Sequence, residues 1–249
     1  PAGATDPAGV DIEIMDAVGK YLGVKVSWEK MKFEGMLTAV ASGRVDAAAG
    51  CIADYGDRQK QATFIDYAYA LIGFTVDATN PHKIVGTDPM SLCGATIALQ
   101  NGTSSPHHLN QYSAYCTDHG GPAIVQKSFP SAAEALLALE SGRADAYITS
   151  YGAGAYQEQQ TNGKVKVVAP PEIPDKYYVN AQPKVYIGVT VSKDDKQLQD
   201  AILAAVQHVR TTGTFYDDLL KKWNVSTFSL DKVGINLHTA RPIVNKNGS

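Results

Sequence analysis

An arginine at position 58 has the chemistry to bind a small carboxylate. It closes the stretch 50–58, where Gly and Asp residues break regular structure after a small, alternating run at 45–49 that is typical of a buried strand. A guanidinium at a strand end offers a rigid fork of donors that matches a carboxylate, and nearby backbone N–H groups can add to the same anion site. The plainer interpretation is a solvated surface arginine in an ion pair.

A second loop carries hydroxyl groups instead of charge. Residues 96–99 are predicted to form a strand, and Gly102, Thr103 and Ser104 follow it just before a predicted helix. Hydroxyls and unpaired N–H groups at a helix start can bind an anion or another polar ligand. A simple helix cap explains the same residues without a ligand.

No metal site is predicted. His107 and His108 form a bare pair after Pro106, which is typical of a surface, and no second His or Cys is placed to join His238. We therefore expect neither a metal nor a cofactor.

Helices and strands alternate in the part of the chain that would position Arg58. The spacing of apolar residues predicts helices over 10–22 and 33–42, and alternation predicts strands over 24–28 and 45–49. Because short links join them, we expect a parallel, doubly wound α/β sheet, in which ligands lie beyond the carboxyl ends of the strands. The stretch that ends in Arg58 falls at such an end.

The rest of the chain continues this alternation. Further strands are predicted at 69–77, 96–99, 144–149, 185–191 and 233–237, and further helices at 131–140, 197–210 and 214–223.

An internal echo indicates two similar lobes. Residues 39–47 and 138–146 share six of nine residues, including Ser-Gly-Arg followed by Asp-Ala, at a spacing of 99 residues. With a crossover at Asn80-Pro81 and a return before the strand at 185–191, we expect residues 1–78 and 184–249 in lobe 1 and residues 79–183 in lobe 2.

The totals are those of a soluble globular protein. The chain has 249 residues, 44% hydrophobic and 19% charged, with a net charge of −3. This charge argues against nucleic acid and gives no reason to expect an anionic membrane partner. No run of 18 apolar residues exists, and we see no signal peptide at the start.

The three cysteines leave the redox compartment open. Cys93 and Cys116 lie 23 residues apart near predicted element ends and could pair, which would imply an oxidising compartment. Two free cytosolic thiols are the alternative. Cys51 remains as a buried thiol beside the anion loop.

Seven short motifs stand in a fixed order along the chain. They are residues 9–14, Phe33-x-Gly35, residues 42–46, Arg58, Phe64-x-Asp66-x-x-Tyr69, residues 102–104 and Lys222-Trp223. Their order and spacing resemble the periplasmic solute-binding proteins of the polar amino acid family, the two-lobed receptors of ABC importers, over nearly the whole chain. The resemblance implies a type II periplasmic-binding-protein fold that closes over its ligand like a Venus flytrap.

The same resemblance implies the partners and location. We expect a small-molecule solute, the membrane subunits of an ABC importer, a monomer, and a periplasmic or membrane-anchored extracellular protein.

One strand is out of the family's order. Family members begin with a strand before the motif at 9–14, whereas here the strand at 233–237 follows Lys222-Trp223. Joining Ser249 to Pro1 would restore the usual order, which implies a circularly permuted chain in which residues 228–249 supply the displaced first strand. The alternative is a strand contributed to a neighbouring copy, as in domain swapping.

The resemblance also implies a ligand site. Arg58 would clamp a carboxylate with help from the backbone of Ala53 and from the lobe 2 hydroxyls of Thr103 and Ser104, between apolar walls from Phe33 and Tyr69. The other candidate residues are Cys51, Asp54, Ser150, Tyr151, His238 and Arg241.

Ser150 departs from the family pattern. Binders of α-amino acids usually carry Asp at this position, and a hydroxyl cannot supply the charge that an ammonium needs. The ammonium would then be held by Asp54, by Asp57 or by aromatic faces such as Phe33, Tyr69 and Tyr151, or the ligand has no ammonium. γ-Aminobutyrate, an ectoine-like ring and other small zwitterions are all candidate ligands.

We expect a receptor that delivers its solute by lobe closure, rather than an enzyme. A cyclohexadienyl-dehydratase-like enzyme on the same fold would need a general acid that faces the cleft, and nothing in the sequence marks Asp54, Asp57 or Glu34 as catalytic. The same fold would also suit the ligand-binding domain of a glutamate-gated channel or an engineered ligand-sensor module.

Overall fold

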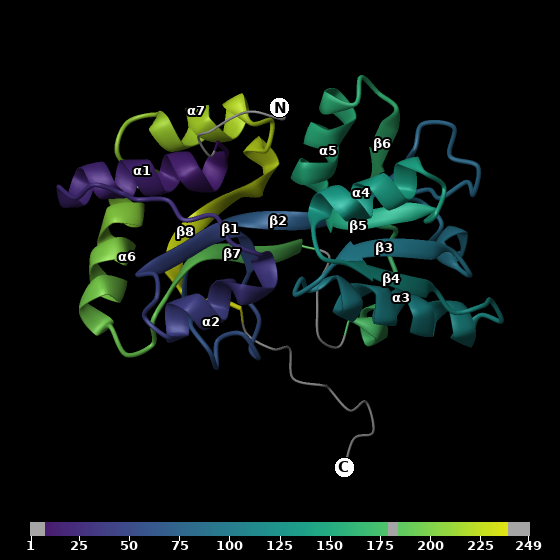
Figure 1. Cartoon of the computed structure of the whole chain (residues 1–249), viewed down its shortest axis with the longest axis horizontal. Helices are drawn as coiled ribbons and strands as arrows, with labels where there is room; N and C mark the ends of the chain where they lie inside the picture. Colours follow the sequence, from purple (N-terminus) through teal and green to yellow (C-terminus); the bar gives the residue numbers. More distant parts are fainter. Residues whose placement is uncertain (1–7, 179–183, 239–249) are drawn as a thin grey trace, which may run out of the picture. The chain divides into compact units, whose positions relative to one another are not determined.

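The computed structural model describes residues 8–178 and 184–238, and their contacts divide the chain into two compact units (Figure 1). Unit 1 contains the described residues up to Ala70 together with Val185–His238, and unit 2 contains Leu71–Lys184. The chain passes from unit 1 to unit 2 within the long strand β2 (Thr63–Asp77). The chain passes from unit 1 to unit 2 between residues 70 and 71 and returns between residues 184 and 185. The sequence predicted these boundaries between residues 78 and 79 and between residues 183 and 184.

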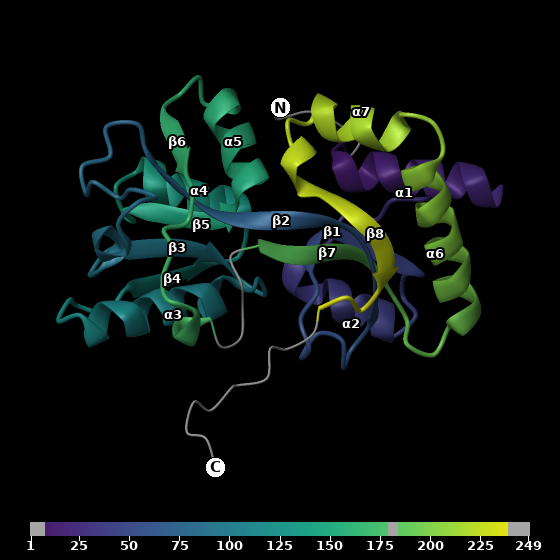
Figure 2. The same ribbon diagram turned by 180° about the vertical axis from the view of Figure 1, so that it is seen from behind.

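Unit 1 combines α-helices with a mostly antiparallel set of strands. Strand β7 lies between β1 and β2; β1 pairs antiparallel with β7, and β2 pairs antiparallel with β8 (Figure 2). The elements are α1 (Val10–Leu22), η1 (Phe33–Gly35), α2 (Met36–Ala41), β1 (Ala47–Ala53), β7 (Lys184–Val191), α6 (Lys196–Thr211), α7 (Phe215–Lys222), η4 (Ser226–Phe228) and β8 (Ser229–Ile235).

The strand predicted at 24–28 is absent, which is a correction. This segment has no regular secondary structure, and Val24 is 59% exposed. Val26 packs on Gly19, where an added Cβ would lie only 2.5 Å from Val26 Cγ2. Alternating residues form a strand only where a neighbouring strand pairs with them. Among the described strands β1 pairs with β7 alone, and no strand pairs with residues 24–28. The parallel β–α–β order expected for this lobe is therefore wrong here.

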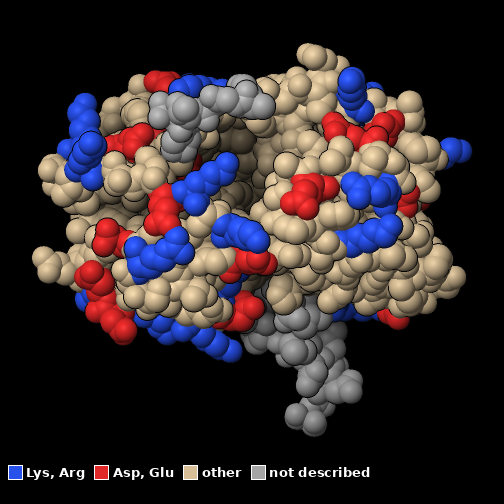
Figure 3. Space-filling model, viewed as in Figure 1, with Lys and Arg blue, Asp and Glu red and all other residues tan. Residues whose placement is uncertain are grey.

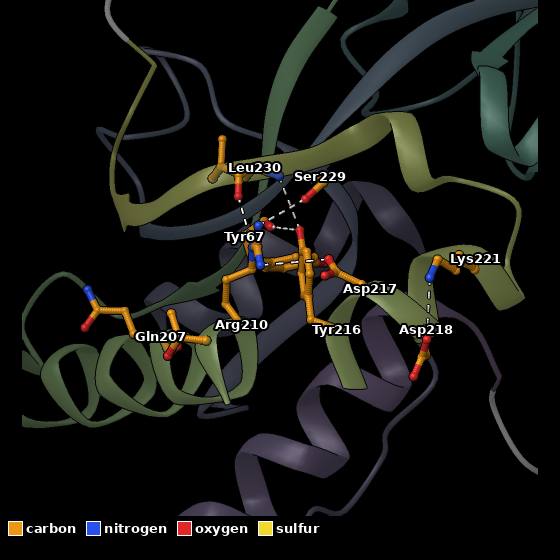
Figure 4. A network of polar contacts seen from close by, with 10 residues as sticks. Tyr67, Gln207, Arg210, Tyr216, Asp217, Asp218, Lys221, Ser229 and Leu230 are labelled. Atoms are coloured by element: carbon orange, nitrogen blue, oxygen red, sulfur yellow. Dashed lines mark hydrogen bonds and ion pairs between the residues drawn. The ribbon is translucent and has the colours of Figure 1, made fainter. Parts of the chain in front are cut away.

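Polar contacts fix the helices of unit 1 to its strands. The Tyr216 hydroxyl on α7 donates to the carbonyl of Tyr67 in β2 and accepts from the N–H of Leu230 in β8 (Figure 4). Arg210 of α6 donates to the Leu230 carbonyl at 3.1 Å, and its guanidinium lies 4.6 Å from the Tyr216 ring centroid. These contacts join α6, α7, β2 and β8.

The closing Lys-Trp motif has a structural role. Lys222 Nζ and Trp223 Nε1 both donate to the Glu13 carboxylate of α1, at 2.9 and 2.8 Å. The hydrogen bonds and the positive charge of Lys222 outweigh the effect of burial and lower the pKa of Glu13. The motif therefore joins α7 to the first helix of the same unit.

Strand β8 belongs to unit 1, as expected for the region 228–249. It begins earlier than the predicted strand at 233–237, and the backbone contact continues to Asn236, whose N–H donates to the Phe64 carbonyl. Residues 1–7 and 239–249 lie outside the described residues, so the circular permutation stays a prediction.

Unit 2 has the parallel, doubly wound arrangement that the sequence predicted for the segment before Arg58 in unit 1. Strand β3 pairs parallel with β4 on one side and with β5 on the other, and the second half of β2 pairs antiparallel with β5 and β6. The elements are η2 (Pro89–Leu92), β3 (Thr96–Gln100), α3 (Ser105–Asp118), β4 (Val125–Phe129), α4 (Ala132–Glu140), β5 (Ala146–Ser150), α5 (Tyr151–Gln160), β6 (Val165–Val168) and η3 (Asp175–Tyr177).

Alternation along β3 places apolar residues on both faces of this sheet. Ile97 and Leu99 enter a core that includes Leu109 of α3, whereas Ala98 between them enters a second core with Leu139 of α4. Because both faces are covered, the three central residues of the strand are all apolar, as in most parallel strands.

The internal echo is a repeated helix stop. Gly43 and Gly142 adopt left-handed conformations, with φ of 71° and 67°. After each glycine, the next backbone N–H donates to a carbonyl five residues back, at Ala39 and at Ala138. The shared Ser-Gly-Arg sequence thus closes a helix in each unit, where glycine avoids the strain that a side chain would suffer.

Cys93 and Cys116 form a disulfide that joins the end of η2 to α3. The pairing predicted for them is confirmed, and the alternative of two free thiols is wrong. Cys51 takes no part in it, and it is half-buried rather than buried as predicted.

Neither the described helices nor the distribution of charged side chains in Figure 3 indicates a membrane span or a highly charged surface. None of the described helices is both long enough and apolar enough to cross a bilayer. On the face seen in Figure 3, acidic and basic side chains are interspersed on each unit, without a large area of one sign.

Candidate ligand-binding site

Arg58 lies in the loop after β1, where its side chain is packed rather than solvated. The residue is 8% exposed, and Nη1 donates to the carbonyl of Ala53 at 2.9 Å. Its Cζ lies 5.8 Å from the ring centroids of both Phe33 and Tyr55. Burial lowers the pKa of Arg58, but an arginine remains charged in proteins. The loop therefore holds a buried cation between two aromatic faces.

A bulge in β1 directs the chain into this loop. The pairing of β1 with β7 shifts register between Ala48 and Ile52, and Cys51 adopts a left-handed conformation with φ of 54°. This conformation is unfavourable for a residue with a side chain. The Cys51 N–H donates to Asp11 Oδ2 at 2.7 Å, and the Tyr67 hydroxyl donates to the other oxygen of Asp11. Burial raises the pKa of Asp11 to about 6. Asp11, in the first turn of α1, thus anchors the bulge.

The loop is also fixed to the chain that follows β8. Asp54 is fully buried and accepts from Gln59 Nε2 at 2.8 Å and from the His238 N–H at 3.0 Å. Gln59 also donates to the His238 carbonyl, and the His238 ring meets the edge of Tyr55 with 5.2 Å between centroids. Two predicted ligand-binding residues, Asp54 and His238, are therefore hydrogen-bonded to each other.

Tyr69 pairs with a tyrosine that the sequence did not single out. Its hydroxyl lies 3.4 Å from that of Tyr186 on β7, and the two ring centroids are 4.8 Å apart. The hydrogen bond with Tyr186 raises the pKa of Tyr69 to about 12. The Tyr186 carbonyl accepts from the Asp54 N–H, which connects this aromatic pair to the Arg58 loop.

The unit 2 candidates lie at helix N-termini. The Thr103 hydroxyl donates to the Gln100 carbonyl at 2.8 Å, and Ser104 occupies the N-cap position of α3. Ser150 caps α5 by accepting from the Ala153 N–H at 3.2 Å, and Tyr151 begins that helix. Strands β3 and β5 are parallel neighbours, so both helix starts lie at the carboxyl edge of the same sheet.

The predicted residues therefore form one group in each unit. In unit 1, contacts connect Arg58, Phe33, Ala53, Asp54 and His238, with Cys51 and Tyr69 beside them. In unit 2, Thr103, Ser104, Ser150 and Tyr151 share a sheet edge. Arg241 lies outside the described residues.

Three contributing residues were missed by sequence reasoning: Tyr55, Gln59 and Tyr186. Tyr55 stood within the loop as an aromatic residue beside Asp54, which is a weak signal. Tyr186 was part of a correctly predicted strand. Gln59 binds the nearby Asp54, but its role in joining the loop to His238 had no local signal, because His238 is 179 positions away. No group of three or more potential metal-ligating side chains occurs in the described part of the chain.

Comparison with known proteins gives the family. A family model described as bacterial extracellular solute-binding proteins, family 3, matches residues 2–226. The chain belongs to this family. The resemblance inferred from the seven motifs is thereby confirmed, and so is the two-lobed periplasmic-binding-protein fold.

Individual relatives agree with this assignment. The solute-binding protein is 28% identical to the arginine-binding protein ArgT of Corynebacterium glutamicum over 229 residues, which are 92% of this chain and 70% of ArgT. A crystal structure of the substrate binding protein of an amino acid ABC transporter matches with a TM-score of 0.73 and 26% identity, over 89% of this chain and 90% of that one.

A third match bears on the enzyme alternative. It is the structure of an ancestral amino acid-binding protein described as a precursor of cyclohexadienyl dehydratase, with a TM-score of 0.71 and 26% identity over 87% of this chain and 85% of that one. That protein is itself named as a binding protein.

Proposed function

We propose that this solute-binding protein binds a small amino acid or amino-acid-like zwitterion by its carboxylate and delivers it to the membrane subunits of an ABC importer. The observation that carries the proposal is the Arg58 guanidinium, buried between Phe33 and Tyr55 and held by Ala53. A planar cation fixed in this way has little further freedom to lose on binding a carboxylate. The names of the matched arginine-binding and amino acid-binding proteins support the same ligand class.

The positive end of the ligand needs a different partner. The oxygens of Asp54 accept hydrogen bonds from Gln59 and His238, and Ser150 caps α5. Both are already engaged by protein groups. Aromatic faces, among them Tyr69 and Tyr151, are then the favoured partners, because a ring face attracts an ammonium or a guanidinium. L-Arginine, with a cation at the end of a long side chain, is our first candidate, followed by γ-aminobutyrate and L-glutamine.

Calorimetric titration of these three solutes tests the proposal. For the solute that binds, we expect Arg58→Ala to weaken affinity about 100-fold, because a charge-assisted contact with a carboxylate is lost. Arg44→Ala is the matched control: its side chain is 61% exposed and pairs with Glu29, so affinity should not change. Equal affinity of Arg58→Ala and the unmodified protein would show that the clamp is wrong.

A second titration isolates the carboxylate. Agmatine is arginine without its carboxyl group, so it should bind far more weakly than L-arginine if Arg58 holds that group. Comparable binding of the two would contradict the proposed orientation of the ligand.

Delivery by closure makes a separate expectation. Small-angle scattering should give a smaller radius of gyration with saturating solute, because a ligand favours the conformation to which it binds better. Size-exclusion chromatography should show a monomer. Turnover of prephenate, in contrast, would favour the dehydratase alternative.

A further inference from the structure

Two carboxyl groups are buried together beside the Arg58 loop. Asp54 lies after β1 and Asp66 lies on β2, and neither has any exposed surface. The N–H groups of two consecutive residues, Leu237 and His238, donate to Asp66 Oδ2 at 2.8 Å and to Asp54 Oδ2 at 3.0 Å, so the two carboxyl groups are neighbours. Such closeness needs an explanation, because two ionised carboxylates repel each other and can only accept hydrogen bonds.

The donors around the pair do not satisfy every oxygen. Asp54 accepts from Gln59 and from the His238 N–H, and Asp66 Oδ2 accepts from the Leu237 N–H at 2.8 Å. Asp66 Oδ1 is buried and has no hydrogen-bond partner. An orphaned carboxylate oxygen next to a second carboxyl group is the arrangement that a shared proton resolves.

The surrounding elements leave the pair little freedom to separate. Asp66 pairs with Gly234 of β8. On the β7 side, a Cβ on Gly188 would lie 2.6 Å from the Ile65 carbonyl oxygen and 2.8 Å from Asp66 Oδ1, so only glycine permits this approach. The carboxyl of Asp66 is thus enclosed by β7, by β8 and by the loop that carries Asp54.

Few charged groups are near enough to offset a second negative charge. Arg58 attracts Asp54 from within the loop, and its other titratable neighbours there are Tyr55, Asp57 and Cys51. His238 faces Asp54 from the segment after β8 through its backbone N–H. From β7, Tyr186 meets Asp54 through its backbone carbonyl.

We propose that Asp54 and Asp66 share one proton, and that this acid pair is a latch that holds residues 237–238 on β2 and on the Arg58 loop. Both are positioning residues: they act on the ligand through Arg58. The ligand part of this inference rests on the proposed function, whereas the proton and the latch do not.

The direction of the pH effect follows from the burial of Asp66. Burial, together with the charge of Asp54, raises the pKa of Asp66 to about 8. An unfolded aspartate titrates near 4, so the folded protein holds a proton that the unfolded chain has lost between about pH 4 and pH 8. The stability that this proton contributes is complete below about pH 4 and is lost as the pH rises through 8.

Unfolding of the unliganded protein tests the proton. Denaturant titrations at pH 6.5 and pH 9 should show a loss of stability in the unmodified protein and a smaller loss in Asp66→Asn, which cannot become a second anion. Asp194→Asn, which removes an exposed carboxylate from the same unit, should behave like the unmodified protein. An undiminished loss in Asp66→Asn would overturn the proposal.

Infrared spectroscopy provides a readout that needs no variant. The unmodified protein at pH 6.5 should show the C=O stretch of a protonated buried carboxyl, and the band should disappear as the pH passes 8. Absence of this band at pH 6.5 would overturn the shared proton even if Asp66→Asn fails to fold.

The affinity for L-arginine tests the latch. The ratio of the affinities of Asp66→Asn and the unmodified protein cancels the titration of the ligand itself. We expect this ratio to rise about tenfold from pH 6.5 to pH 9, because an opened latch lowers the population of the competent loop. A constant ratio with measurable binding would overturn the positioning role and leave the proposed function intact. If L-arginine does not bind although the unfolding and infrared results hold, the ligand assignment fails and the proton pair stands.

Discussion

The two units bury different kinds of titratable group. Unit 1 encloses carboxyl groups, and burial raises the pKa of Asp66 to about 8 and that of Asp11 to about 6. Unit 2 encloses an imidazole on α3: His108 is 1% exposed, so the surface position predicted for it is wrong. Burial, with the neighbouring His107, lowers the pKa of His108 to about 3. In each case burial favours the neutral form, which for a carboxyl is protonated and for an imidazole is deprotonated.

These opposite shifts give the units opposite responses to pH. Asp66 and Asp11 have folded pKa values above their unfolded ones, so the stability that they contribute is lost as the pH rises from about 4 through 6 and 8. His108 has a folded pKa below its unfolded value, so its contribution is present above about pH 6.5 and is lost as the pH falls toward 3. Asp66 and Asp11 thus weaken unit 1 as the pH rises, and His108 weakens unit 2 as the pH falls.

The largest change in stability that could contradict this comparison is expected for a substitution of His108. Each buried imidazole that must gain a proton costs about 1.4 kcal/mol per pH unit below pH 6.5. Between pH 7 and pH 4, His108→Gln should therefore lose about 3 kcal/mol less stability than the unmodified protein, as measured by denaturant unfolding. His119→Gln, which changes an exposed histidine after the same helix, should lose as much as the unmodified protein. If His108→Gln and His119→Gln lost equal stability between pH 7 and pH 4, His108 would not be the source of acid sensitivity in unit 2.

A change at Asp11 should have the next largest effect. Asp11→Ala leaves the Cys51 N–H and the Tyr67 hydroxyl without their acceptor, and two partly buried donors without partners cost about 2–3 kcal/mol. The bulge before the Arg58 loop should then loosen. Denaturant unfolding at pH 7 measures the cost.

Asp11→Asn is the matched comparison, because its amide oxygen still accepts one hydrogen bond. We expect a smaller loss of stability than in Asp11→Ala, and no contribution from position 11 to the pH dependence between about 4 and 6. If Asp11→Ala were as stable as the unmodified protein, anchoring of the bulge by this carboxylate would be excluded.

Much of the fold was predictable from local pattern. The helix at 10–22 was placed correctly because its apolar spacing is regular and Gly23 ends it in a left-handed conformation. The predicted strand at 24–28 failed because alternation describes one strand and says nothing about its neighbour. Strand β4, helix α5 and strand β6 were not predicted at all.

The candidate site was predictable only where its chemistry is local. Arg58 stood out because a strand, a break and a guanidinium follow one another in the sequence. The partnership of Asp54 with Asp66 and with His238 could not be found in the same way, because it joins a loop, a strand interior and a segment 184 positions from Asp54. A buried carboxyl pair depends on tertiary packing, and a single sequence carries no local sign of it.

The smallest effect separates the two interpretations of Ser150. As a helix cap it accepts from the Ala153 N–H, so Ser150→Ala should cost about 1 kcal/mol of stability, as should Ser131→Ala at the cap of α4. Ser150→Asp should remain as stable as the unmodified protein, because Asp caps helices as well as Ser does.

Ser150→Asp also places a negative charge at the sheet edge of unit 2, where the predicted residues supply hydroxyls and no carboxylate. If the positive end of L-arginine approaches this edge, Ser150→Asp should strengthen binding about tenfold, as a hydrogen bond to a charged group is worth. Unchanged affinity with unchanged stability would leave Ser150 as a cap alone and would keep the charged contacts of the ligand in unit 1.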